Sequence, residues 1–537
     1  MKPPRLPAHP ATDPGGGPKG WAWGVPALLL ALLPLLLVQV PPLADYPNHL
    51  ARMALLAGQA PGLAADYAVR WAVLPNLAMD LLVPPLLAVL PLHAAGRLAL
   101  ALAAALPVLG VVAYHRAAFG SAEGRGWWPW AAALLAWNGV LLLGFVNFIL
   151  GTGLAFGVAA AWMRLAPRRP GLAALALALG GAAAFLCHLV ATGFLFLLVA
   201  THEAGRLWED RAQGGAALRR FVGHGLLAGL ALLPVLALHA LAAPGGGALE
   251  WGTAWQRLER LPVPFAAYHA RWDLLAAGLV ALAAAGLLLG RRAAVHPGSA
   301  LAALACLLLY AVVPTEVGGG AFLEPRFTLF AALLLFAGLR PRLGRRASGA
   351  LALGAGALLL LRVWLLALAW QGAARDLQAL RQAVATLPPG ARLATATVER
   401  AANPRYFLDQ EGRRLLSFLW FRTEAHTGAL VALERGASWP GLFAIAGQQP
   451  IIRGPAIADF TPSRWHALPD RTVLDPAAPP PAGVPPALLE PWRGWEARFD
   501  HVLVLHSRAA GDAARFLPDR LELLADTGFA ALYRVRR

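Results

Sequence analysis

Long apolar runs recur along most of this 537-residue chain, and they limit the folds that it can adopt. Hydrophobic residues make up 58% of the chain and charged residues only 14%. A soluble domain cannot bury so much apolar surface, whereas a chain that crosses a membrane many times exposes that surface to lipid. We therefore predict an all-α polytopic membrane protein with about eleven transmembrane helices, in a range of about ten to thirteen.

The predicted spanning segments share an apolar composition and a length close to what a bilayer requires. They fall near residues 21–40, 98–115, 128–143, 148–163, 171–186, 188–202, 222–242, 272–290, 299–314, 326–340 and 348–370. No small-residue cleavage site follows the first run, which favours an uncleaved helix over a signal peptide. The stretch 77–92 is interrupted by Pro84 and Pro85, so we expect a re-entrant or interfacial segment there.

The arginines predict how the chain is oriented. A formal net charge of +17 suggests nucleic acid at first sight, but the sequence has no long basic tract with interleaved aromatic residues. The arginines instead gather in alternate connections, such as 164–169 and 340–346, as the positive-inside bias produces. We predict a multi-pass bacterial inner-membrane protein with a cytoplasmic tail at 1–20, an outer first loop at 41–97 and no nucleic-acid partner.

The residue composition of the sequence changes near Gln371. Charges of both signs mix with Pro and Gly, and short β-type runs occur at 392–398, 501–505 and 530–535. Helical periodicity is visible around 423–435, and the Pro-rich stretch 476–491 is typical of a loop. We therefore predict a small soluble α/β domain over residues 371–537. The odd number of crossings predicted for the transmembrane domain 21–370 puts this domain in the periplasm.

The densest group of ionisable residues follows the first apolar run, in the sequence Asp45-Tyr46-Pro47-Asn48-His49-Leu50-Ala51-Arg52. Ionisable groups at a membrane boundary are costly to hold and often functional. Pro47 favours a helix start, which places Asp45 at the positive end and puts His49 and Arg52 on one face. Asp45 is then a candidate general base or metal ligand, with His49 or Arg52 holding an anion. Alternatively, Asp45 only caps the helix and pairs with Arg52.

Other polar residues are predicted on the same side of the membrane. Asp80 is either a second acid in an outer cavity or a water-facing interfacial residue. His188 is either a ligand-binding residue or a polar residue at a tight turn. Arg326 opens a helix and suits phosphate because of its forked donors, or else it pairs with Glu324 or anchors to a headgroup. The remaining candidate substrate contacts are Glu316, Glu324 and Arg362.

The overall layout resembles the GT-C class of integral-membrane glycosyltransferases, including polyprenyl-phosphate-sugar-dependent arabinosyl- and mannosyltransferase-like proteins. The resemblance covers roughly residues 20–370. It rests on the acid after the first helix, Asp45; on the Pro-broken segment with an Arg, 77–97; on the late helix that opens with Arg326; and on a soluble domain after the last span.

This resemblance implies transfer of a sugar, with inversion, from a polyprenyl-phosphate donor to an envelope lipid, glycan or protein acceptor. It implies that Asp45 acts on the acceptor and that Arg326 holds the lipid phosphate. Many members carry two acids in the first loop, whereas here Asp45 stands alone and the next acid is Asp66. A divalent metal cofactor is therefore left open.

Other classes of protein remain alternatives. A secondary transporter or flippase would show internal repeats and charges near the membrane midplane, and the sequence shows neither pattern. A non-enzymatic envelope-assembly protein would use the C-terminal domain for binding, and an O-antigen polymerase or ligase would share the transfer chemistry. The sequence has no P-loop, His-Glu-x-x-His or Cys-x-x-Cys pattern. If Asp45, His188 and Arg326 act together, we expect them to line one cavity.

Overall fold

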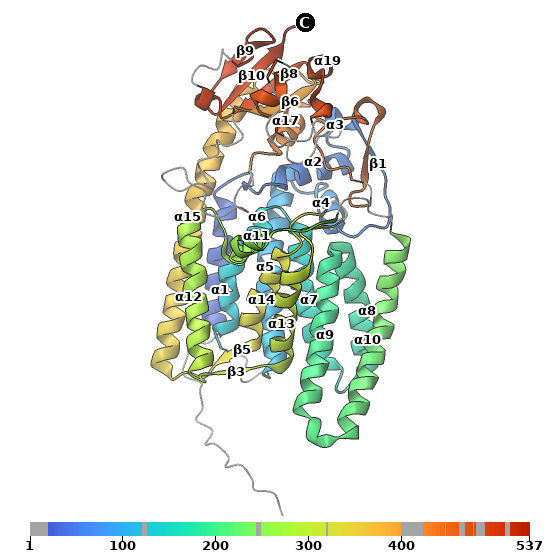
Figure 1. Cartoon of the computed structure of the whole chain (residues 1–537), viewed down its shortest axis with the longest axis vertical. Coiled ribbons are helices and arrows are strands. Elements are labelled where there is room, and N and C mark those ends of the chain that lie inside the picture. Colours follow the sequence, from blue (N-terminus) through green and yellow to red (C-terminus); the bar gives the residue numbers. More distant parts are fainter. Residues whose placement is uncertain are drawn as a thin grey trace, which may run out of the picture.

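The computed structural model describes residues 20–120, 126–242, 249–317, 320–398, 423–445, 447–460, 468–475, 477–478, 489–510 and 516–537. A helical bundle makes up most of it, and a small α/β domain covers one end (Figure 1). We call this the upper end, as in Figure 1. The predicted fold class, an all-α polytopic membrane protein with a small C-terminal α/β domain, is confirmed.

Among the described residues, six helices are long and apolar enough to cross a membrane, judged by length and composition. They are α5 (Leu92–Ala118), α7 (Val146–Leu165), α8 (Pro170–Cys187), α10 (Gly215–Leu241), α12 (Ala270–Leu289) and α15 (Arg345–Ala383). The other apolar segments are α1 with η1 (Gly20–Leu32, Leu33–Leu36), η3 with α6 (Trp128–Leu135, Gly139–Leu142), α9 (Leu189–Glu209), α13 (Pro297–Val312) and α14 (Pro325–Gly338). Each lies on one of the predicted spanning segments.

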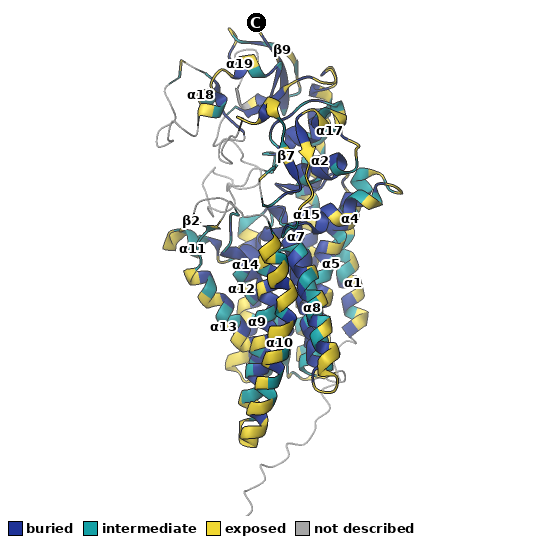
Figure 2. Cartoon of the chain, turned by 90° about the vertical axis from the view of Figure 1, so that its right-hand side faces the viewer, coloured by how far each residue is buried: buried dark blue, intermediate teal, exposed yellow. Residues whose placement is uncertain are grey.

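The outward faces of the peripheral helices carry leucines. On α10, Leu226 is 66% exposed, and on α12, Leu282 is 71% exposed. Figure 2 shows such exposed residues along the outer helices, while α7 is mostly buried at the centre of the bundle. A helix facing water would carry polar residues on this side, so these apolar faces fit contact with lipid.

The segment 128–143 differs from the single α-helix expected there. It forms a 3₁₀ helix, η3, and then the four-residue α6, and both lie buried. Pro129 stands in the first turn of η3, and the Asn138 side chain accepts a hydrogen bond from Leu141 N as the N-cap of α6. A capping asparagine stabilises a new helix start, so the segment bends instead of continuing straight.

Short elements cover the upper end of the bundle. The first loop forms α2 (Tyr46–Leu56), α3 (Pro61–Ala64), β1 (Tyr67–Val69) and α4 (Ala78–Leu86). Later connections form β2 (Leu249–Glu250), α11 (Ala254–Arg260), η5 (Val263–Phe265) and β4 (Glu316–Val317). At about 1.5 Å per residue, the nine-residue α4 is too short to cross a bilayer. The lower end carries η4 (Arg211–Gln213) and the pair β3 (Ala293–Val295) and β5 (Leu339–Pro341).

A four-stranded sheet forms the centre of the C-terminal domain. Its strands, in spatial order, are β6 (Leu393–Thr397), β8 (His501–Leu505), β10 (Ala530–Val535) and β9 (Leu521–Asp526). β6 runs parallel to β8, and the other pairs are antiparallel. The other elements are α17 (Thr427–Arg435), β7 (Ile451–Arg453), η7 (Pro455–Ile457), α18 (Arg471–Leu474), η10 (Glu490–Trp492), α19 (Trp495–Arg498) and η11 (Ser507–Ala510).

The C-terminal domain is attached to the bundle in three ways. Helix α15 continues past residue 370, the predicted end of the last span, and reaches the domain at Ala383. Strand β7 pairs with β1 of the first loop, with Tyr67 opposite Arg453. Helix α17 packs on α2, which follows directly after Asp45. These contacts hold the domain over the polar cluster that the sequence singles out.

Candidate functional site

A cavity of about 760 Å³ lies between the bundle and the C-terminal domain. Its bundle wall includes Asp45, His49, His188 and Arg326, and its domain wall includes His426. Among the described lining residues Asp45 is the only carboxylate, and the arginines are Arg326 and Arg453. The three residues that we expected to share a cavity therefore do share one.

Asp45 is held by the turn that ends α6. The backbone N–H of Asp45 donates to Leu143 O at 3.2 Å, and that of Ala44 donates to Leu142 O at 3.0 Å. Gly144 has a φ of +105°, a conformation that favours glycine. A Cβ on Gly144 would lie only 2.5 Å from Asp45 Cβ and 2.9 Å from Asp45 N. The close approach of these two segments therefore depends on a glycine at this position.

The alternative role for Asp45, in which it only caps α2 and pairs with Arg52, does not agree with the structure. Asp45 is the N-cap residue of α2, yet its side chain makes no capping hydrogen bond. Arg52, the expected partner, instead donates to Asp80 through Nε at 2.6 Å and Nη2 at 3.2 Å. The described contact of the Asp45 carboxylate is His426, with Nε2 3.4 Å from Oδ1. Within the described part of the chain, the buried Asp45 carboxylate therefore has neither the capping hydrogen bond nor the arginine partner expected of a structural role.

His49 lies one turn after Asp45 and also lines the cavity. Its Nε2 donates to Gly144 O at 3.0 Å, which ties α2 to the same turn that holds Asp45. Burial, with a smaller effect from the nearby Arg52 cation, lowers the pKa of His49 to about 3. His49 is therefore neutral at physiological pH, and its buried Nδ1 has no hydrogen-bond partner among the described residues. It is available as an acceptor, not as an anion-binding cation.

Arg326 lies in the first turn of α14 and is 6% exposed. Its Nη1 is 2.9 Å from His188 Nε2, its Nη2 donates to Ala321 O at 3.2 Å, and its Nε has no described hydrogen-bond partner. The guanidinium also lies 4.7 Å from the Phe145 ring and 5.3 Å from the Phe148 ring. A buried cation with no carboxylate partner among the described residues is poised to bind an anion.

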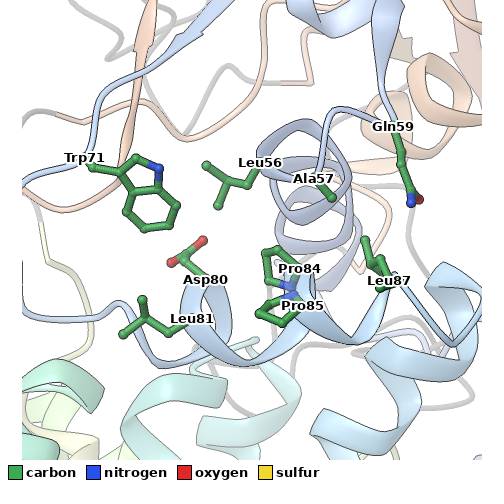
Figure 3. A pocket seen from close by; sticks show the side chains of 10 residues that line it. Leu56, Ala57, Gln59, Trp71, Asp80, Leu81, Pro84, Pro85 and Leu87 are labelled. Atoms are coloured by element: carbon green, nitrogen blue, oxygen red, sulfur yellow. The ribbon is translucent and has the colours of Figure 1, made fainter.

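Five of the predicted substrate contacts do not line this cavity. Arg52 and Asp80 form their own buried pair, and Asp80 borders a separate pocket of about 450 Å³ beside Trp71 and Pro84 (Figure 3). Pro84 and Pro85 of α4 line the same second pocket as Asp80. Asp80 therefore belongs to this pocket of the first loop and not to the cavity that holds Asp45. We therefore leave Arg52 and Asp80 out of the proposed site.

The other three have roles elsewhere at the upper end. Glu324 pairs with Arg260 of α11, not with Arg326. Arg362 pairs with Asp273 at 3.2 Å and donates to the carbonyls of Leu134, Phe265 and Trp137, so it joins η3 to its neighbours. Glu316 lies on β4, next to Val317, which does line the cavity. Glu316 and Glu324 are each next in sequence to a lining residue, whereas Arg362 and its partners do not line the cavity. We leave all three out of the proposed site as well.

The domain wall of the cavity holds residues that sequence reasoning missed. His426 and Arg453 supply polar groups, and Trp439, Phe443 and Phe499 supply aromatic surface. The only sequence signal for them was that His426 falls within the helical pattern at 423–435 and that Arg453 follows two isoleucines. Nothing in the local pattern indicates that α17 packs on α2, so their proximity to Asp45 is a result of tertiary structure.

The described residues do not form an evident metal site. Asp45 and His426 are adjacent, but no group of three or more His, Cys, Asp or Glu side chains with ligand geometry occurs in the described ranges. Catalytic zinc usually takes three protein ligands of this kind. The donor set around Asp45 does not fit such an ion, and we derive no step through one.

Breaking the Arg52–Asp80 pair is expected to destabilise the first loop. Both side chains are fully buried, so Asp80→Leu alone leaves an unpaired buried cation, at a cost of about 3–5 kcal/mol. The double variant Arg52→Met with Asp80→Leu should recover most of that loss. Thermal unfolding of the purified protein measures both. Equal stability of the single and double variants would show that the pair carries no such coupling.

Gly144→Ala is expected to impair the site more than the overall fold. The added methyl group meets Asp45 at sub-van der Waals distance, and the positive φ is unfavourable for alanine. We expect a displaced Asp45 and a loss of activity of about 100-fold, because small misplacements of catalytic groups are costly. Gly157→Ala, in open space on α7, is the matched control and should leave activity unchanged. An active Gly144→Ala variant would contradict this role.

Comparisons with known proteins found few similarities. No family model matches the chain, and no curated protein matches it. Among solved structures, the chain is similar to the crystal structure of ArnT from Cupriavidus metallidurans bound to undecaprenyl phosphate. The two share 13% sequence identity and a TM-score of 0.47, over 96% of this chain and 98% of that chain.

Proposed function

We propose that this chain is an integral-membrane glycosyltransferase of the GT-C type. It would move a sugar from a polyprenyl-phosphate donor to a hydroxyl group on an envelope lipid, glycan or protein. One observation carries the proposal: a single cavity holds a buried carboxylate, Asp45, and a buried guanidinium, Arg326. Among the described residues, Asp45 has no capping hydrogen bond and no arginine partner, and Arg326 has no carboxylate partner.

The two groups match the charges that develop during sugar transfer. Asp45 would accept the proton of the acceptor hydroxyl as its oxygen forms a bond to the anomeric carbon. The bond between that carbon and the phosphate oxygen breaks, and Arg326 would stabilise the negative charge on the departing lipid phosphate. The acceptor attacks from the side opposite the leaving group, so the anomeric configuration inverts.

The remaining lining suits an amphiphilic donor. Apolar side chains near Arg326, such as Phe145, Phe148, Leu189 and Phe322, offer a surface for the first prenyl units. Polar groups, such as the side-chain N–H groups of Asn76 and Gln449, offer hydrogen bonds for sugar hydroxyls. The cavity lies at the upper end of the spanning helices, at the depth where a lipid headgroup would lie.

The arginine pattern supports an external site. The Arg-rich connections 164–169 and 340–346 lie at the lower end of the bundle, which by the positive-inside rule supports a cytoplasmic lower end. The cavity and the domain of residues 384–537 would then lie outside, in the periplasm of a bacterium with two membranes. A donor in the outer leaflet of the inner membrane would reach Arg326 from the side of the bundle.

A transfer assay tests the proposal. The purified protein in liposomes is incubated with polyprenyl-phosphate sugars and a cell-envelope extract, and free polyprenyl phosphate is measured. We expect release that depends on both the protein and the extract. No consumption of any such donor, with movement of the intact lipid across the bilayer, would favour the flippase alternative instead. Binding of a partner without either activity would favour the envelope-assembly alternative.

A further inference from the structure

His426 comes from the C-terminal domain and contacts Asp45 from across the cavity. It precedes α17, is buried, and places Nε2 3.4 Å from Asp45 Oδ1. Its ring packs edge-on against Phe443, with centroids 4.6 Å apart, and lies 6.5 Å from the Trp439 ring centroid. These contacts fix the plane of the imidazole, so the question is which nitrogen carries the proton.

Asn48 determines which ring nitrogen of His426 is protonated, because the Asn48 amide can have only one orientation. The backbone N–H of Phe443 donates to it at 3.0 Å, so the atom facing Phe443 must be the oxygen Oδ1. The other atom is then Nδ2, which donates to Gly441 O at 2.9 Å. A flipped amide would place N–H against N–H and oxygen against oxygen. Both contacts therefore require the observed orientation.

The fixed amide selects one tautomer of His426. Asn48 Nδ2 carries two hydrogens and lies 3.3 Å from His426 Nδ1. One hydrogen serves Gly441, and the other points to Nδ1, which must therefore accept. The proton of the neutral imidazole then resides on Nε2, the nitrogen that faces Asp45. An N–H on Nδ1 would point against the N–H of Asn48, so the arrangement excludes the tautomer protonated at Nδ1.

We propose that His426 is a positioning residue for Asp45: an imidazole whose Nε2–H faces one carboxylate oxygen, 3.4 Å away, and leaves the other for the acceptor hydroxyl. This inference rests on the proposed function. His426 does not act as a base, because Nδ1 accepts from Asn48 and Nε2 faces Asp45 with its proton. The C-terminal domain thereby supplies part of the active site through the Asn48–His426–Asp45 chain.

Two substitutions separate this donor role from packing. Glutamine can place a side-chain N–H close to the position of Nε2, whereas alanine removes the donor. We expect His426→Ala to lower kcat by about 10- to 100-fold, with KM for both substrates changed by less than about twofold, as for other residues that orient a catalytic group. His426→Gln should retain most of the activity. Equal loss in both variants at equal thermal stability would overturn the donor role.

The tautomer of His426 can be measured by NMR, without an activity assay. The full chain in lipid nanodiscs, labelled with ¹⁵N-histidine, gives ring-nitrogen shifts that distinguish the tautomers, and His426→Gln identifies the signals of His426. We expect an unprotonated Nδ1, a protonated Nε2, and a change in the Nε2 shift in Asp45→Asn. A protonated Nδ1 would overturn the proposal. Absence of sugar transfer by the wild-type chain, with the expected tautomer present, would instead fault the proposed function.

Discussion

Asp45→Asn is expected to abolish sugar transfer and to leave abundance and fold intact. The change is isosteric, and the asparagine can still face His426, but it cannot take a proton from the acceptor hydroxyl. Loss of a positioned general base costs about 10²- to 10⁴-fold in rate. Because Asp45 makes no capping hydrogen bond and no pair with Arg52, its removal should cost little stability. Donor turnover by the purified variant measures the effect.

Asp459→Asn provides the matched control for this prediction. Asp459 is an exposed carboxylate of the C-terminal domain, it pairs with Arg498, and it does not line the cavity. The same change of charge at Asp459 should leave turnover within about twofold of wild type, as surface substitutions usually do. Normal turnover by Asp45→Asn would remove Asp45 from the mechanism and, with it, the proposed assignment of the cavity.

Arg326→Ala is expected to weaken donor binding by about 10- to 100-fold while affinity for the acceptor stays nearly unchanged. A charge-assisted hydrogen bond to a buried anion contributes about 1.5–3 kcal/mol, which corresponds to that range. Arg326→Lys should recover only part of the affinity. Lysine keeps the charge but loses the forked donors and the contacts with the Phe145 and Phe148 rings. Binding of a polyprenyl phosphate to the purified variants gives the affinity directly.

Arg498→Ala is the control for removal of a guanidinium. Arg498 is a partly exposed residue of the C-terminal domain that pairs with Asp459 and is not itself among the lining residues, although the adjacent Phe499 is. Its loss should leave donor affinity unchanged. If Arg326→Ala binds the lipid phosphate as tightly as wild type, or if its acceptor KM rises instead of its donor KM, Arg326 does not hold the donor phosphate.

The helical part of the fold could be predicted because membrane helices follow from local composition. Long apolar runs such as 98–115 and 222–242 correspond to α5 and α10, since a buried or lipid-facing helix needs little beyond apolar residues of sufficient number. The segment 128–143 was less predictable. Its break at Asn138 depends on a capping hydrogen bond, which hydropathy does not register.

The C-terminal strands were partly predictable for a similar reason. The runs 501–505 and 530–535 correspond to β8 and β10 because they are rich in residues that favour buried strands. The predicted loop at 476–491 lies largely outside the described residues. Strand β9 was missed, since only its first residue, Leu521, is buried and its register shifts opposite β10, so it lacks a regular alternation.

The site residues on the bundle could be predicted from the sequence, but those contributed by the C-terminal domain could not. Asp45, His49, His188 and Arg326 were identified because each is an ionisable residue at the edge of an apolar run. His426 was not, since it approaches Asn48 from 378 positions away, and no local pattern encodes that contact. The pairing of Arg52 with Asp80 was also missed, because a helical spacing rule compares residues within one helix and these lie on two.

The most direct measurement of the central claim is a cryo-electron microscopy structure of the protein with a bound polyprenyl phosphate. We predict density for the lipid in the cavity between the bundle and the C-terminal domain, with a phosphate oxygen about 3 Å from the Arg326 guanidinium. The Asp45 carboxylate should face the same space, with room for one sugar between the two groups. A lipid phosphate bound elsewhere, with the cavity filled by the protein's own residues, would contradict the account.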